Sequence, residues 1–321
     1  MEMIKWGIIG CGDVAEVKSG PAFQKVANSE LIAVMRRNGA KAEDFAKRHN
    51  VPFWYDSVED ILNHPEINAV YIATPPSTHL EIAKQCLATN KFVYLEKPIT
   101  VNAYEAKTLA KIVTQNDKIV VAHYRRNLPA FQKVKELLDA NSIGKVLSVD
   151  IQILQSKFNN IITKTEDHWR IKPNISGGGY FHDIGPHQID LMYLYFGKIK
   201  NAQGFSTSTQ NNRVADIVNG IIEFESGVQF RGIWNFIASE EDVKDECKIF
   251  GEKGTITFSF YGEKVFLNID EKQEVFQFEN PKHIQQPLIA ETVNYFLGTT
   301  KNPCALENGV QVMEIIDTFT T

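Results

Sequence analysis

Cysteine is scarce in this chain of 321 residues, and neither a long apolar run nor an excess of positive charge is present. The four cysteines are far apart and form no Cys-x-x-Cys pair, so the sequence indicates neither a disulfide framework nor a zinc site, and we expect no metal. No stretch of about 18 apolar residues predicts a membrane span. The net charge of -5 and the pI of about 5.9 argue against nucleic acid as the main partner.

We also expect no secretory signal and no internal repeat. The opening apolar stretch is broken by Lys5 and followed by glycines, which is typical of a buried strand rather than of a signal peptide. We therefore expect a cytoplasmic protein with reduced thiols, in which Cys11 is a small space-filling residue. Because 321 residues exceed the usual size of a single core, two domains are expected.

Residues 1–122 alternate short apolar runs with helical patterns. The apolar runs are 4–9, 31–35, 69–73, 92–95 and 119–122, and the helices include 40–49, 79–89 and 103–115. Strands that are apolar throughout are typical of a parallel sheet with both faces covered, which binds ligands at the carboxyl ends of its strands. This part of the α/β chain is predicted to be a Rossmann domain.

Residues 123–321 have a different hydrophobic pattern. A helix is predicted near 129–140, a polar loop over 157–174 and a helix over 180–196. Strands then follow near 202–208, 217–225, 228–235, 246–251, 254–260, 264–269 and 274–278, with helices at 287–297 and 309–319. Strands of this kind predict a large, mostly antiparallel sheet in a second domain, while loop residues 157–164 and His283 are expected to shape a substrate pocket.

Aromatic side chains are frequent in these later strands. They are Phe224, Phe230, Trp234, Phe236, Phe258 and Phe260. Such a sheet face either covers helices or pairs with another subunit, and we expect a homodimer or homotetramer.

The sequence Gly10-Cys11-Gly12-Asp13-Val14-Ala15 directly follows the first predicted strand. In a dinucleotide site the first glycine allows a tight turn, the second lets the backbone approach a pyrophosphate, and the small third residue lets helix and strand pack closely. A glycine turn that only bends the chain is the alternative.

Arg36 and Arg37 end the second predicted strand. A site that prefers NAD places a carboxylate there for the ribose 2′-hydroxyl, whereas arginine suits the 2′-phosphate of NADP. The sequence therefore favours NADP, with NAD as the alternative, although a solvated basic strand end would have the same pattern.

Two further strand ends carry polar residues. The strand predicted at 69–73 runs into Thr74-Pro75-Pro76-Ser77-Thr78-His79, and the strand predicted at 92–95 runs into Glu96-Lys97-Pro98. A lysine at the carboxyl end of a central strand is expected where a substrate would meet a nicotinamide. The alternative is a surface Glu–Lys ion pair without a catalytic role.

A glycine run, Gly177-Gly178-Gly179, precedes the predicted helix that carries Asp183, His187 and Asp190. Spacings of four and three residues place the three side chains near one helix face. A histidine can pass a proton near neutral pH, and a neighbouring carboxylate can orient it. Pro186 is expected to kink this helix, and a purely structural role is the alternative.

In order and spacing, the glycine turn, the Thr74–His79 loop, the Glu-Lys-Pro tripeptide and the glycine run with its Asp and His resemble the Gfo/Idh/MocA oxidoreductase family. The resemblance implies a C-terminal α/β domain with an open sheet that binds substrate and forms oligomers. It implies that Lys97, His187 and Asp183 are catalytic. Implied cofactor contacts are Gly10, Gly12, Asp13, Val14, Arg36, Arg37, Thr74, Pro75, His79, Glu96, Lys97, Trp169 and Arg170, and implied substrate contacts are Lys97, Tyr124, Arg125, Trp169, Asp183 and His187.

The resemblance implies hydride transfer between NADP(H) and a hydroxyl or carbonyl carbon of a sugar, polyol or related cyclic alcohol. Two alternatives stay open. One is an enzyme that keeps its NAD(P) tightly held and uses transient oxidation, either to cleave glycosides or to exchange hydride between sugars. The other is a regulator that binds dinucleotide and sugar without chemistry. The sequence names no particular substrate.

Overall fold

The computed structural model describes residues 2–156, 161, 169–209 and 214–321. Most of the predicted loop 157–164 therefore lies outside the described residues. The chain divides into two compact units, Met1–Tyr124 with Pro281–Met313, and Arg125–Asn280 with Glu314–Thr321. The sequence predicted one boundary, after residue 122. That prediction did not anticipate that residues 281–313 belong to the first unit.

The first unit contains a six-stranded sheet in the order β3-β2-β1-β4-β5-β6, and every strand pair is parallel. The strands are β1 (Ile4–Ile9), β2 (Ser29–Met35), β3 (Phe53–Tyr55), β4 (Ala69–Ile72), β5 (Phe92–Leu95) and β6 (Ile119–Val121). This order confirms the predicted Rossmann fold. The order reverses between β1 and β4, so ligand chemistry is expected at the carboxyl ends of these two strands.

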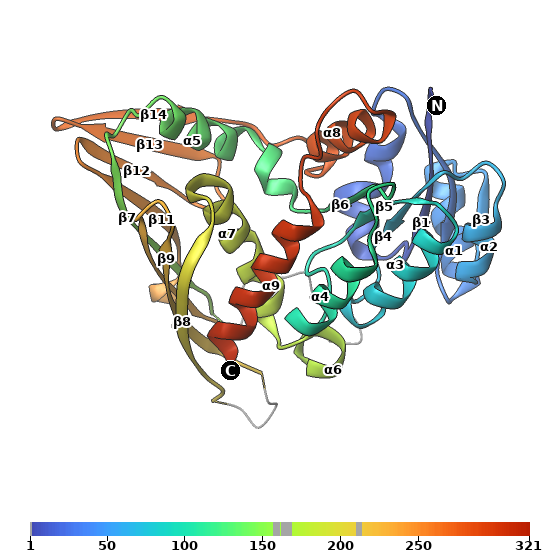
Figure 1. Cartoon of the computed structure of the whole chain (residues 1–321), viewed down its shortest axis with the longest axis horizontal. Coiled ribbons are helices and arrows are strands. Elements are labelled where there is room, and N and C mark those ends of the chain that lie inside the picture. Colours follow the sequence, from blue (N-terminus) through green and yellow to red (C-terminus); the bar gives the residue numbers. More distant parts are fainter. Residues whose placement is uncertain (1, 157–160, 162–168, 210–213) are drawn as a thin grey trace. The chain divides into compact units, whose positions relative to one another are not determined.

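The helices of the first unit pack on this sheet (Figure 1). They are α1 (Gly39–His49), α2 (Val58–Asn63), α3 (His79–Ala88), α4 (Ala103–Ile112) and, from the returning segment, α8 (Gln286–Leu297). The Phe296 ring of α8 lies 5.7 Å from Trp6 and 5.1 Å from Phe92. Lys118 Nζ donates to the Phe296 carbonyl oxygen over 2.6 Å. Apolar burial and a capped helix end therefore fix the segment in this unit.

The second unit contains an eight-stranded sheet in the order β14-β13-β12-β11-β7-β10-β9-β8. The strands are β7 (Val146–Leu154), β8 (Ile199–Thr207), β9 (Ile217–Phe224), β10 (Gln229–Asn235), β11 (Lys244–Gly251), β12 (Gly254–Phe258), β13 (Lys264–Ile269) and β14 (Lys272–Gln277). All neighbours are antiparallel except β7 and β10, which confirms the mostly antiparallel prediction. β7 was not predicted from the sequence, although this strand lies inside the sheet.

One face of this sheet packs against α5 (Pro129–Asp139), α7 (Tyr180–Phe196) and the end of α9 (Leu306–Thr320). Figure 1 shows α7 and the end of α9 along the same side of the strands. The ring of Trp234 lies 4.9 Å from Phe181 of α7 and 6.1 Å from Phe319 of α9. All six aromatic residues singled out in the sequence are at most 2% exposed, so they cover helices and do not form an exposed association face.

Three glycines pair with one another across β8, β9 and β10, namely Gly204, Gly220 and Gly232. A Cβ at Gly220 would lie 2.1 Å from the Phe319 ring, and one at Gly204 would lie 2.7 Å from it. The glycines thus open a slot in the sheet surface for the C-terminal aromatic ring. This close approach explains why the strands tolerate residues that otherwise weaken them.

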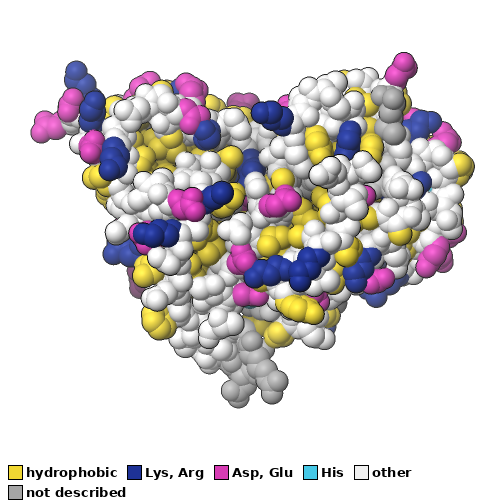
Figure 2. Space-filling view, in the orientation of Figure 1, with side chains coloured by type: hydrophobic (Ala, Val, Ile, Leu, Met, Phe, Trp, Pro, Cys, Tyr) yellow, Lys and Arg dark blue, Asp and Glu magenta, His cyan; other side chains and the backbone are white. Residues whose placement is uncertain are grey.

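Among the described residues, no helix is both long and apolar enough to cross a bilayer. No group of three or more His, Cys, Asp or Glu side chains within the same residues could hold a metal ion. On the face shown in Figure 2, basic side chains lie among acidic ones.

Candidate functional site

The glycine turn begins where β1 ends. Gly10 has a φ of +97°, and a Cβ there would lie 2.8 Å from the Ala73 carbonyl carbon at the end of β4. By contrast, a Cβ at Gly12 would meet no heavy atom within 4 Å. Gly10 is therefore required by the tight turn, while the empty space beside Gly12 leaves room for a phosphate. This cradle fits the pyrophosphate of a dinucleotide.

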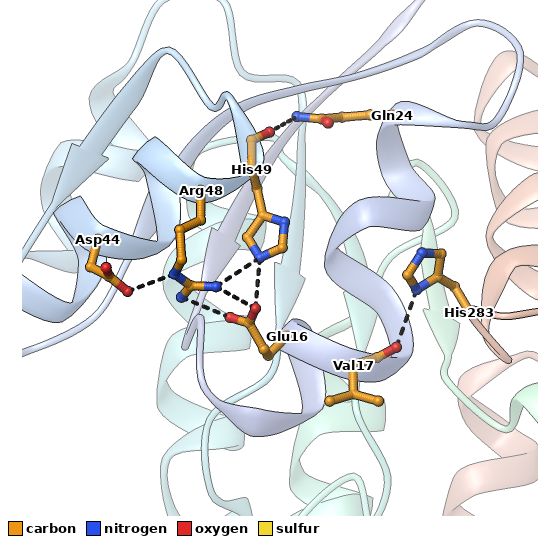
Figure 3. A network of polar contacts seen from close by, with 7 residues as sticks. All are labelled: Glu16, Val17, Gln24, Asp44, Arg48, His49 and His283. Carbon is orange, nitrogen blue, oxygen red and sulfur yellow. Dashed lines mark hydrogen bonds and ion pairs between the residues drawn. The ribbon is translucent and has the colours of Figure 1, made fainter.

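The segment after the turn is a short π-helix, η1 (Ala15–Ser19), followed by the 3-10 helix η2 (Gly20–Gln24). Figure 3 shows Glu16 of η1 directed toward the last turn of α1. Arg48 donates to both Glu16 carboxylate oxygens over 2.5 and 3.0 Å, and His49 Nε2 lies 2.8 Å from Oε1. The hydrogen bond from Arg48 lowers the pKa of Glu16, which is consistent with a carboxylate that anchors η1 to α1.

Arg36 follows β2 and is half-buried, whereas the next residue, Arg37, is exposed. Burial raises the pKa of the Cys11 thiol to about 11, and the positive charge of Arg36 acts in the opposite direction. Arg36 therefore exerts its charge at the glycine turn, while Cys11 stays a protonated, buried thiol, as expected of a space-filling residue. Asn38 accepts a hydrogen bond from Lys41 N over 3.1 Å and caps α1.

His79 begins α3 and is fully buried. Its Nε2 lies 2.7 Å from the Thr74 carbonyl oxygen, and its Nδ1 lies 3.0 Å from that of Pro98. Burial lowers the pKa of His79. Both ring nitrogens therefore contact backbone, so the imidazole braces the loops that carry Thr74-Pro75 and Lys97-Pro98.

Glu96 follows β5 and is 6% exposed. Its Oε1 accepts hydrogen bonds from Tyr71 Oη and Gln285 Nε2, each over 2.6 Å, and its Oε2 accepts one from the Lys97 backbone N over 3.1 Å. Lys97 is half-buried, and its peptide bond to Pro98 is cis. The Glu96 carboxylate thus holds the Lys97 backbone just after the end of β5.

In the second unit, α7 follows the glycine run and contains Pro186 without ending there. Asp183 Oδ2 accepts a hydrogen bond from Arg170 Nε over 2.8 Å, and the Arg170 guanidinium lies 4.5 Å from the centre of the Trp169 ring. His187 is 4% exposed and lies one helical turn after Asp183. Trp169, Arg170 and Asp183 therefore form one cluster at the beginning of α7.

Other predicted residues have structural partners. Asp190 receives two hydrogen bonds from the Arg126 guanidinium, over 2.8 and 2.6 Å, in a buried ion pair. The Arg125 guanidinium donates to the Phe260 carbonyl oxygen and lies 4.3 Å from the centre of the Tyr261 ring. Tyr124 is 2% exposed in the first unit.

Sequence reasoning missed Tyr71, Gln285 and His182. A Cβ at Gly178 would lie 2.2 Å from the His182 ring, so the middle glycine of the run makes room for this imidazole. Burial lowers the pKa of His182 to about 4, so the ring is neutral near pH 7. Tyrosine hydroxyls in strands that are otherwise apolar were a signal for a buried acceptor, but nothing in the sequence linked Gln285 to them.

The comparisons cover almost the whole chain. Residues 4–124 match a family model described as the oxidoreductase family with an NAD-binding Rossmann fold, and residues 131–257 match the GFO/IDH/MocA C-terminal domain. The chain is 53% identical over 318 residues to Oxidoreductase P35 of Formosa agariphila, covering 98% of each chain. The chain belongs to the Gfo/Idh/MocA oxidoreductase family.

Two solved structures of similar fold are complexes with a nicotinamide nucleotide. A levoglucosan dehydrogenase in complex with NADH and levoglucosan has a TM-score of 0.87 at 20% identity, covering 98% of this chain and 96% of that one. A 3-ketoreductase from Actinomadura kijaniata in complex with NADP and TDP-benzene has a TM-score of 0.84 at 19% identity, with the same two coverages. At these identities, both comparisons support the fold alone.

Proposed function

We propose that this protein transfers hydride between NADP(H) and a hydroxyl or carbonyl carbon of a sugar, polyol or related cyclic alcohol. The observation that carries the proposal lies within one Rossmann sheet. There, an open glycine turn follows β1, and Glu96 and Lys97 follow β5, with the Lys97 backbone held by the buried Glu96 carboxylate. Family membership supports the oxidoreductase activity, and the sugar-like substrate is proposed by analogy with the levoglucosan dehydrogenase and the 3-ketoreductase, which share the fold.

The cofactor would be held by the first unit. Gly10, Gly12, Asp13 and Val14 are assigned to the pyrophosphate, because the space beside Gly12 leaves room for it at the end of β1. Arg36 and Arg37 are assigned to the 2′-phosphate of NADP. Thr74 and Pro75 are assigned to the cofactor as well. His79 and Glu96 are assigned an indirect role, because they hold the backbone of the neighbouring loops. The two solved relatives carry different nucleotides, so the preference for NADP rests on the arginines.

When bound, the nicotinamide ring accepts or donates the hydride. In the direction of alcohol oxidation, the substrate carbon loses its hydrogen with the bonding electron pair, and the hydroxyl proton goes to His187 Nε2 or Nδ1. The Lys97 ammonium stabilises the negative charge that develops on the substrate oxygen. Asp183 accepts a hydrogen bond from Arg170 and lies one turn before His187, where a carboxylate orients the imidazole and supports its charged form. Reduction reverses each step.

Tyr124 and Trp169 complete the proposed substrate contacts, and Arg170 contributes through Asp183. Arg125 is better explained by its contacts with Phe260 and Tyr261 than by a substrate contact.

We also propose a cytoplasmic homodimer or homotetramer. The face of β8 and β9 away from the helices carries Phe205, which is 81% exposed, and Ile221, which is 54% exposed. Apolar side chains on an open sheet face are suited to association with a second copy.

The test is turnover of purified protein with NADP and a panel of polyols and cyclic sugars, and with NADPH and the corresponding ketoses. Lys97→Met and His187→Asn should each reduce kcat by about 100-fold or more, while the Kd for NADPH stays close to that of the wild type. Variants as active as the wild type would remove these residues from the mechanism. Nucleotide released only on unfolding, without net turnover, would favour the enzyme with a tightly held cofactor.

A further inference from the structure

We propose that Gln285 is a positioning residue for Lys97, acting through the carboxylate of Glu96. The proposal deepens the function above and rests on it, because it assumes that Lys97 contacts the reacting substrate. Gln285 lies outside the residues that either family model matches, 4–124 and 131–257. It enters the first unit with the returning segment Pro281–Met313, immediately before α8.

Both ends of the Gln285 amide have partners. Its Nε2 donates to Glu96 Oε1 over 2.6 Å, and its Oε1 accepts a hydrogen bond from Tyr94 Oη over 3.0 Å. The side chain is fully buried. Since Tyr94 fixes the amide orientation, Gln285 presents its N–H group to the carboxylate in one defined direction.

The carboxylate of Glu96 therefore has three donors, which come from three parts of the chain. Tyr71 Oη and Gln285 Nε2 both reach Oε1, and the Lys97 backbone N reaches Oε2. A buried carboxylate that loses such a donor has a larger desolvation cost, which favours another rotamer. Loss of the Gln285 amide would therefore loosen the hydrogen bond that holds the Lys97 backbone.

The segment that carries Gln285 also contacts η1, the short helix after the glycine turn. Gln285 N donates to the Lys18 carbonyl oxygen over 3.3 Å, and His283 Nδ1 lies 3.2 Å from the Val17 carbonyl oxygen. Figure 3 shows His283 beside Val17, with Glu16 of the same short helix turned toward α1. In addition, Ser19 Oγ donates to Tyr71 Oη over 3.1 Å. One buried cluster thus joins η1 to the strand end that carries Lys97.

A catalytic group that is displaced by a fraction of an ångström loses rate without losing substrate affinity. We therefore expect Gln285→Met, which keeps the side-chain length but removes both polar groups, to lower kcat by about tenfold or more with little change in KM. Tyr71→Phe removes one hydroxyl from the same Oε1 and should lower kcat in the same way. It is also the milder change, should Gln285→Met fail to fold.

The double variant separates positioning from general destabilisation. If both residues act through Glu96, the loss of kcat in the double variant is smaller than the product of the two single losses, whereas independent structural effects multiply. Gln286→Met is the matched control, since it makes the same substitution at a partly exposed neighbour. It should leave kcat unchanged.

Hydrogen exchange of the Lys97 backbone amide provides a readout that needs no substrate. Exchange at this amide should be faster in Gln285→Met and Tyr71→Phe than in the wild type and the Gln286→Met control, because its acceptor is no longer held. An active wild type with unchanged kcat and unchanged Lys97 exchange in both variants would overturn the positioning role. A wild type that turns over no substrate of the panel would instead overturn the proposed function.

Discussion

Arg170 donates a hydrogen bond from Nε to Oδ2 of Asp183 over 2.8 Å, and the pair is largely shielded from solvent, with side chains 7% and 18% exposed. The carboxylate nearest the start of α7 is therefore held by a cation from η5 (Trp169–Ile171). Because Asp183 lies one helical turn before His187, this contact holds the carboxylate that is assigned to assist proton transfer.

Replacing Arg170 tests this relationship. Arg170→Met removes the guanidinium that donates to Asp183, so the carboxylate beside His187 is held less firmly and kcat/KM should fall by about tenfold or more. Arg170→Lys should recover only part of the rate, because an ammonium lacks the planar fork of the guanidinium and its stacking on Trp169. Steady-state kinetics of the two variants provide the measurement. Equal rates in wild type and Arg170→Met would show that the ion pair has no part in the reaction.

His182 makes stability depend on pH. Its folded pKa of about 4 lies below the ordinary value of 6.5, chiefly because of burial. Between these values the unfolded chain binds the proton that the folded chain excludes, so stability falls as pH falls from 6.5 toward 4. The full contribution is on the order of 3 kcal/mol. We expect urea unfolding of His182→Gln to show a weaker pH dependence than the wild type over this range, and parallel curves would contradict the assignment.

The glycine slot beneath Phe319 predicts a steric effect on stability. Gly220→Ala would place a methyl group 2.1 Å from the ring, and we expect it to lower the free energy of unfolding by about 1–3 kcal/mol. Adding Phe319→Leu should recover part of that loss, because the two residues share the slot. Asn219→Ala, at the exposed neighbouring position of β9, is the control and should change stability by less than about 0.5 kcal/mol. Denaturant titration that shows independent effects at 220 and 319 would contradict the contact.

Much of the fold could be predicted because its signals are local. Continuous apolar runs predicted the parallel sheet, and β1, β5 and α7 begin and end at the predicted residues. The prediction missed β7, even though Val149, Ile151 and Ile153 alternate with polar neighbours as a strand with one buried face requires. The return of residues 281–313 to the first unit depends on contacts such as Phe296 with Trp6, which no local pattern encodes.

The candidate site divides in the same way. Motifs of fixed spacing predicted Gly10, Gly12, Lys97 and Asp183 as site residues. The partners that hold them, Arg170 for Asp183 and Gln285 for Glu96, come from distant parts of the chain and have no fixed spacing. The aromatic residues of the second sheet show the limit of pattern alone, because the sequence could not decide between a helix layer and a second subunit as their cover.

The most direct test of the account is a paired titration of the protein with NADPH and NADH, followed by fluorescence transfer from tryptophan to the nicotinamide. We expect NADPH to bind more tightly, and Arg36→Ala to weaken NADPH by about tenfold or more while leaving NADH nearly unchanged, because only NADPH carries the 2′-phosphate. Tighter binding of NADH, or an equal loss of both nucleotides in Arg36→Ala, would contradict the assignment of Arg36 to that phosphate.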